Sequence, residues 1–132
     1  MSSHSKRKVV TCSNAPAAIG PYSVAITTDS LVFVSGQLGI NPTSGLIVGG
    51  GIQAQTRTAL TNLKSVLESA GSSLEQVVKT TVFLTDMAQF AEMNGVYAEF
   101  FTSDYPARSA IQVAALPKGG IVEVEAIAVL PA

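Results

Sequence analysis

Apolar and polar positions along the chain form a pattern that predicts six strands and two helices, in the order β-β-β-α-β-α-β-β. Thr28-Asp29-Ser30 is a short polar connection between two apolar runs, which is typical of a hairpin turn. The stretch 36–51 is rich in glycine, proline and asparagine, so it is expected to be a loop. The predicted strands are residues 9–12, 23–27, 31–35, 77–84, 107–114 and 121–130.

Apolar residues at spacings of three and four predict the first helix from Ile52 to Ala70, and Gly71 is suited to end it. Polar residues fall between its apolar ones, namely Gln55, Arg57, Asn62, Lys64 and Glu68. The second helix is predicted from about Met87 to Phe101, with Asp86 as its N-terminal cap. Its inward-facing residues are expected to be Phe90, Met93, Tyr97, Phe100 and Phe101.

Strands 77–84 and 121–130 are apolar on both sides of the pleat for much of their length, which is typical of strands buried on two faces. Two helices can cover only one face of such a sheet. Hydrophobic residues make up 47% of the chain, which also favours burial between subunits. We therefore expect a homo-oligomer in which a second copy covers the other face.

The 132 residues are expected to form a flexible tail, 1–8, and a single domain, 9–132. The basic run Lys6-Arg7-Lys8 is interpreted as a solvated tail, and the net charge of −1 argues against nucleic acid as a partner. No apolar run of eighteen residues occurs, so no membrane span is expected. The one cysteine, Cys12, fits a reducing compartment. This favours the cytoplasm, with the mitochondrion as the alternative.

Arg108 is the first candidate for chemistry, because only 13% of the residues are charged and this one lies in a predicted strand. Alternation places Arg108 and the small Ala110 on the same side of that strand, which leaves room for a ligand. A guanidinium matches a carboxylate with two parallel hydrogen bonds. A structural salt bridge to Glu123 or Glu125 explains the same residue, and spacing alone leaves the choice open.

Glu123 and Glu125 share one face of the last strand, about 7 Å apart. Paired carboxylates in a dry setting can provide a general base. They can equally be interface partners of basic residues, namely Lys79, Lys118 or Arg57. Histidine-based triads and zinc sites are not expected, because His4 lies in the tail and Cys12 has no partner. No metal or cofactor is therefore predicted.

Four weaker candidates also have structural explanations. Asn94 is a polar residue on the inward stripe of the second helix, and Tyr22 follows the sharp turn Gly20-Pro21. Ser35 and Gly36 stand at the end of a strand, where a hydroxyl and a free amide can face a ligand.

Five segments together closely resemble the RidA (YjgF) family, in order and in spacing, across residues 9–130. They are NAPAAIGPY at 14–22, FVSGQ at 33–37, VKTTVFL at 78–84, PARS at 106–109 and VEAIA at 124–128. The resemblance implies a chorismate-mutase-like α+β fold. It also implies a mixed sheet with two helices on one face and a barrel-like homotrimer with ligand sites in the clefts between subunits.

The resemblance also implies an activity, the cofactor-free hydrolysis of reactive 2-imino and enamine acids such as 2-iminobutanoate and 2-iminopropanoate. Pyridoxal-phosphate-dependent dehydratases release these compounds, and the products are a 2-oxo acid and ammonia. Two alternatives are a non-catalytic 2-oxo acid binding or regulatory protein and an endoribonuclease or translation inhibitor. The near-neutral charge argues against the last of these.

Roles in the site follow from the resemblance by position. Arg108 would hold the substrate carboxylate, and Glu123 would orient or deprotonate the attacking water. Tyr22, Ser35, Gly36 and Asn94 match pocket positions of the family. Ala110 stands where many relatives carry cysteine, and its backbone is expected to contact the ligand.

Overall fold

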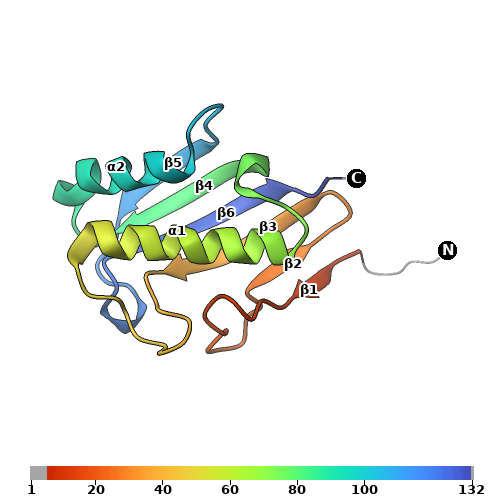
Figure 1. Cartoon of the computed structure of the whole chain (residues 1–132), viewed down its shortest axis with the longest axis horizontal. Coiled ribbons are helices and arrows are strands. Elements are labelled where there is room, and N and C mark those ends of the chain that lie inside the picture. The colour runs from red at the N-terminus through yellow and green to blue at the C-terminus, as the bar shows by residue number, and fades with distance from the viewer. Residues whose placement is uncertain (1–5, 132) are drawn as a thin grey trace.

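The computed structural model describes residues 6–131 and shows one six-stranded sheet with two α-helices packed against a single face (Figure 1). The strands are β1 Lys8–Val10, β2 Ala25–Thr27, β3 Leu31–Leu38, β4 Val77–Leu84, β5 Ala107–Gln112 and β6 Val122–Val129. The α-helices are α1 Gly51–Ser69 and α2 Phe90–Phe100, and the short 3-10 turns are η1 Leu74–Gln76, η2 Met87–Gln89 and η3 Pro117–Gly119. The predicted element order is confirmed. His4 and most of the predicted tail lie outside the described residues.

The strand order is β1-β2-β3-β6-β4-β5, so the last strand of the chain lies in the middle of the sheet. β6 pairs antiparallel with both β3 and β4. β4 and β5 form a parallel pair joined across α2, as a parallel connection requires a crossover. The sheet is therefore mixed, and β5 is one of its edges.

The core lies between the helices and the sheet. Leu60, Leu63 and Leu67 of α1 have no exposed surface, and neither do Val122 and Val124 of β6. Each such side chain contributes roughly 1.5–3 kcal/mol by leaving water. Alternation along β6 turns its odd-numbered residues, including Glu123 and Glu125, toward the opposite face.

Two polar residues of α1 differ from the prediction that they fall between the buried positions. Asn62 is buried, and its Nδ2 donates to the carbonyls of Leu38 at 3.2 Å and Ile40 at 2.9 Å. Gln55 is also buried, and its Oε1 accepts from the amide of Ile121 at 3.0 Å. Both side chains satisfy backbone groups at or next to strand ends. They fix α1 to the segments that carry the site.

Some predicted boundaries are wrong by a few residues. Asp86 does act as a cap and accepts from the amide of Ala88, but η2 follows it and α2 begins only at Phe90. β3 continues through the predicted loop start to Leu38, past an irregularity in its pairing with β6 between Val34 and Gln37.

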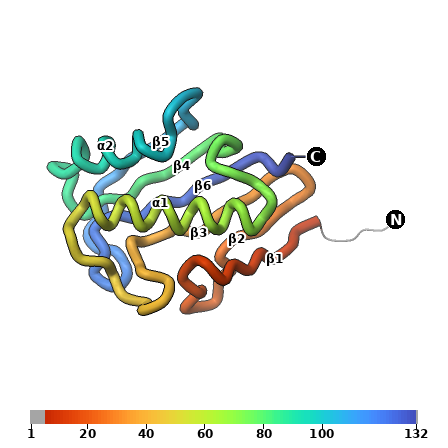
Figure 2. The backbone as a smooth tube through the Cα atoms, in the orientation of Figure 1, coloured from red at the N-terminus to blue at the C-terminus, as the bar shows by residue number. Residues whose placement is uncertain are grey.

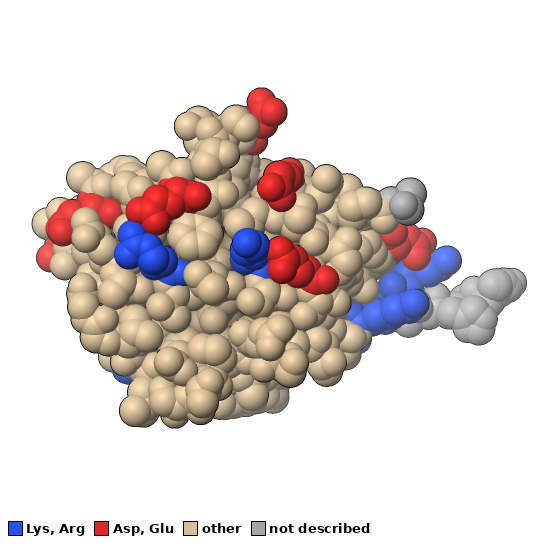
Figure 3. Space-filling model, in the orientation of Figure 1, with Lys and Arg blue, Asp and Glu red and all other residues tan. Residues whose placement is uncertain are grey.

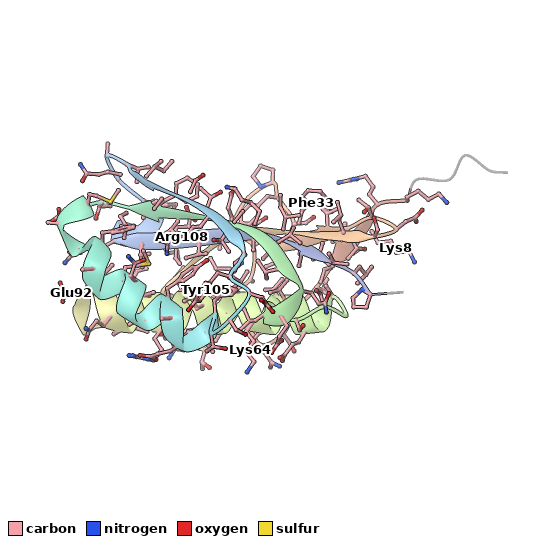
Figure 4. All side chains as sticks on the ribbon, turned by 90° about the horizontal axis from the view of Figure 1, so that it is seen from above. Lys8, Phe33, Lys64, Glu92, Tyr105 and Arg108 are labelled. Carbon is pink, nitrogen blue, oxygen red and sulfur yellow. The ribbon has the colours of Figure 1, made fainter. Side chains whose placement is uncertain are left out.

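The second face of the sheet is uncovered in a single chain. Figure 4 shows both helices on one side of the sheet and Phe33 pointing to the other side. Phe33 is 41% exposed and Ile111 is 45% exposed. Within residues 6–131 no helix is long and apolar enough to cross a membrane.

Candidate functional site

Arg108 lies between the edge of the sheet and α2, on the helix-facing side (Figure 4). Its guanidinium carbon is 4.7 Å from the centre of the Tyr97 ring and 5.3 Å from that of Phe90. Its Nη1 donates to Oδ1 of Asn94 at 2.7 Å. Aromatic faces attract a cation, and the amide oxygen fixes its direction. The arginine is therefore held in place before any ligand binds.

Tyr97 is itself held in place by a hydrogen bond to the sheet. Its hydroxyl is 2.8 Å from Oγ1 of Thr80, and the pair is buried. Burial raises the pKa of Tyr97, so the ring remains neutral and supports Arg108 as an aromatic face. Within residues 6–131 the other guanidinium N–H groups of Arg108 have no hydrogen-bond partner, which leaves them free to bind an anion.

Glu123 lies in a different place, in a cavity of about 830 Å³ at one end of the sheet. Three connections line this cavity, and Figure 2 shows them together along the lower edge of the molecule. They are the β1–β2 connection, the loop between β3 and α1, and the turn before β6. Most residues that line the cavity are uncharged. Figure 3 shows the opposite, helix-bearing side, where the lower part of the surface also carries few charged side chains. An acid in mostly apolar surroundings is typical of a small-ligand site.

Gly36 packs directly against the Glu123 carboxyl group. A methyl group at Gly36 would lie 2.6 Å from Cδ and Oε2 of Glu123, closer than real atoms approach. The irregular pairing of β3 with β6 at this point resembles a β-bulge, which is a common way to direct a side chain into a site. Gly36 therefore leaves the space that the carboxyl group occupies.

The pKa of Glu123 is raised, first by burial and then by repulsion from the neighbouring Glu125. A carboxylate whose pKa moves toward neutrality becomes a better proton acceptor for water. Arg108 is not among the groups that change the pKa of Glu123, because it lies on the other side of the sheet.

Ser35 and Tyr22 complete the cavity wall next to Glu123. The Ser35 hydroxyl donates to the carbonyl of Ser23 at 2.6 Å, and its amide donates to Val24 at 2.9 Å. This serine therefore fixes the segment that carries Tyr22, and only the lone pairs of its oxygen remain for a ligand.

The structure thus divides the predicted site residues into two groups. Tyr22, Ser35, Gly36 and Glu123 meet in the cavity, while Arg108 and Asn94 meet beside α2, with Ala110 on the same side of β5. β4 separates β5 from β6, and Arg108 and Glu123 point to opposite faces.

The alternative of a salt bridge from Arg108 to Glu123 or Glu125 within one chain is therefore wrong. Among the described residues Arg57 pairs with Glu99 at 2.8 Å, and neither Lys79 nor Lys118 forms a salt bridge with a glutamate. The aromatic support of Arg108 was not predicted, although Phe90 and Tyr97 had been placed on the inward stripe of the second helix. In the described part of the chain no group of three or more metal-ligating side chains occurs.

This fold and this site define a class, an α+β protein with two helices on one face of a mixed six-stranded sheet and a carboxyl group of raised pKa in a cavity at one end of that sheet. The model of the family described as endoribonuclease L-PSP matches residues 12–130. The chain therefore belongs to that family, the RidA/YjgF family indicated by its motifs.

Relatives match nearly the whole chain. A Bos taurus protein named 2-iminobutanoate/2-iminopropanoate deaminase is 52% identical over 93% of this chain and 90% of its own length. The Homo sapiens protein of the same name is 46% identical with the same coverage.

Solved structures of two E. coli proteins share the fold. The YjgF gene product is 42% identical with a TM-score of 0.90, covering 94% of this chain and 99% of its own. TdcF, solved with bound serine, is 44% identical with a TM-score of 0.89, covering 92% of this chain and 98% of its own.

Proposed function

We propose that this protein is a cofactor-free deaminase that hydrolyses 2-imino acids to 2-oxo acids and ammonia. The observation that carries the proposal is the half-buried Glu123, whose pKa is raised inside a small-ligand cavity. The fixed guanidinium of Arg108 supplies the group that binds a carboxylate. The names of relatives at 46–52% identity support the same chemistry.

We further propose that the complete site forms between two copies of the chain, within a homotrimer. Arg108 and Glu123 face opposite sides of the sheet, so one chain cannot place both against the same small molecule. The uncovered face carries Phe33 and Ile111, which a second copy would bury. The Glu123 cavity of one copy would then receive Arg108 and Asn94 of the next.

The reaction needs one bound anion and one proton acceptor. Arg108 holds the carboxylate of the 2-imino acid. Glu123 takes a proton from a water molecule while the oxygen of that water bonds to the imine carbon. The electrons of the C=N double bond move to the nitrogen. Glu123 then returns the proton to this nitrogen. As the C–N bond breaks and ammonia leaves, Glu123 takes the proton of the new hydroxyl group so that the C=O group forms, and it passes that proton to ammonia or to solvent. Positioning and one base suffice, because a protonated imine carbon is already electrophilic.

A coupled assay tests the activity. A threonine dehydratase generates 2-iminobutanoate, and the rate of 2-oxobutanoate formation is followed with and without this protein. We expect Arg108→Ala to abolish the acceleration, whereas Arg57→Ala should retain it, because Arg57 pairs with Glu99 on the exposed helical surface. An Arg108→Ala variant as active as the wild type would refute the role of the guanidinium.

Mixing two inactive variants tests the shared site. Arg108→Ala and Glu123→Ala subunits are unfolded together, refolded and assayed. In a cyclic trimer about one quarter of the interfaces would combine an intact Arg108 with an intact Glu123, so about one quarter of the activity should return. A mixture that stays inactive while forming mixed oligomers would place both residues in a site within one chain.

Binding without turnover is the second outcome that the assay distinguishes. A protein that bound 2-oxobutanoate but never accelerated its formation would be the 2-oxo acid binding protein considered above. For the place of action we propose the cytoplasm, in keeping with the single free Cys12. One relative, from Arabidopsis thaliana, is named a chloroplastic protein.

A further inference from the structure

Two turns face each other across the Glu123 cavity. One is the loop 41–46, and the other is η3, which precedes β6. Pro42 and Gly45 line the cavity from one side, and Pro117 and Lys118 line it from the other. Figure 2 shows both connections at the same end of the molecule.

Each turn is fixed internally. In the loop, the Asn41 amide donates to the Leu46 carbonyl at 2.9 Å, and the Gly45 amide donates to the Asn41 carbonyl at 2.8 Å. In η3, the Gly120 amide donates to the Pro117 carbonyl at 3.1 Å. Each turn therefore has its own internal hydrogen bonds, and a contact between their tips is additional to these.

A single side chain joins the tips. Nζ of Lys118 donates to the carbonyl oxygen of Gly45 at 3.1 Å. Within residues 6–131 this is the one hydrogen bond between the two turns, and Lys118 forms no salt bridge there. The ammonium group of the exposed Lys118 thus contacts a loop carbonyl at the rim of the cavity.

The backbone of Lys118 is strained. Its φ is +58°, in the left-handed region, which costs a residue with a side chain about 1–2 kcal/mol. Gly119 beside it also has a positive φ, of +72°. A glycine or asparagine would adopt the conformation of Lys118 at lower cost, so a lysine here indicates that its side chain has a role.

We propose that Lys118 is a positioning residue that closes the mouth of the Glu123 cavity by joining η3 to the loop 41–46. With the bridge formed, a small bound acid must wait for the turns to separate before it leaves. The identity of the ligand rests on the proposed function, whereas the bridge itself is observed in the structure.

Three variants at Lys118 separate the possible roles. Lys118→Met removes the donor but keeps the length of the side chain, and Lys118→Arg keeps both donor and charge. Lys118→Gly removes the bridge and also relieves the backbone strain, so it should be at least as stable as the wild type. Comparison of Met with Gly therefore separates loss of the bridge from loss of folding.

The first measurement is amide hydrogen exchange of residues 41–46 in the protein without ligand. We expect faster exchange at Gly45 and Leu46 in Lys118→Met and Lys118→Gly, and wild-type exchange in Lys118→Arg. Unchanged exchange in both Met and Gly variants would overturn the proposal. This readout involves no turnover, so it stands even if the protein proves not to be a deaminase.

The second measurement is the rate at which 2-oxobutanoate dissociates, at low and high salt. We expect Lys118→Met and Lys118→Gly to release it about two- to tenfold faster, the range for one lost hydrogen bond, at both salt concentrations. A difference that disappears at high salt would show that Lys118 only attracts anions, and would overturn the proposal. In the imine assay the pH dependence of kcat should be unchanged in the same variants.

Discussion

At the scale of single residues, the site depends on close contacts rather than on long-range charge. Glu123 gains its raised pKa from burial against Gly36 and from Glu125, and Arg108 gains its fixed direction from two rings and one amide. Sequence reasoning selected both charged residues, because charges in apolar strands need a partner. It could not predict that they diverge, because alternation gives the faces within one strand but not which face the helices cover.

Gly36→Ala should displace the Glu123 carboxyl group, since the added methyl would lie 2.6 Å from it. We expect a loss of deaminase activity of at least tenfold, with only a small change in stability, because the end of the half-buried Glu123 side chain can move aside. Urea unfolding and the coupled assay measure the two effects. Gly49→Ala is the matched control, because nothing lies within 4 Å of a methyl group there. Equal activity of Gly36→Ala and Gly49→Ala would contradict a close contact between Gly36 and the Glu123 carboxyl group.

Glu123→Gln should change stability in a pH-dependent way. The pKa of Glu123 is raised on folding, so its contribution to stability is fully present below the ordinary carboxyl range and is lost as pH rises through the raised value. The variant should therefore gain free energy of unfolding relative to the wild type at pH 7 and gain little at pH 4, while losing activity. Urea unfolding at a fixed protein concentration measures this, with the exposed Glu68→Gln as control. A larger gain in free energy of unfolding at pH 4 than at pH 7 would contradict a raised pKa of Glu123.

At the scale of elements, the sequence pattern predicts the bounds of helices and strands where neighbouring residues determine those bounds. The bounds of β4 agree with the prediction at both ends, and α1 agrees within one residue, because turn residues and periodicity mark them. The position of β6 between β3 and β4 could not be read in this way, since it depends on pairing between residues far apart in the chain. The burial of Gln55 and Asn62 has the same origin, because their partners are backbone groups at or next to the ends of strands far away in the sequence.

Gly95→Ala tests whether α2, which carries Asn94, can be stabilised without a change in ligand binding. Gly95 is exposed within the helix, and a methyl group there would meet nothing within 4 Å. Alanine should stabilise the helix by about 1 kcal/mol and leave ligand binding unchanged. A denaturation midpoint in urea and a dissociation constant for 2-oxobutanoate provide the measurements. Lower stability, or a change in molecular mass, would instead show that a second copy covers this face of α2.

At the scale of the whole molecule, the helices cover one face of the sheet and leave the other to a partner. Phe33→Asp places a charge on that uncovered face. An exposed substitution on a monomer changes stability by only about 0.5 kcal/mol, whereas a charge buried between copies prevents assembly. Light scattering should therefore show a smaller mass for Phe33→Asp, together with lost activity. Gln53→Asp, on the exposed side of α1, is the control. A full-sized, active Phe33→Asp protein would place the subunit contact elsewhere.

The divergence of Arg108 and Glu123 has a consequence for how the protein behaves at low abundance. On the proposal of a shared site, a newly synthesised chain is inert until it encounters its copies. Specific activity should then fall when the protein is diluted below its assembly constant, and it should return on concentration. Cells that express little of it would then hydrolyse less 2-imino acid than a simple proportion suggests.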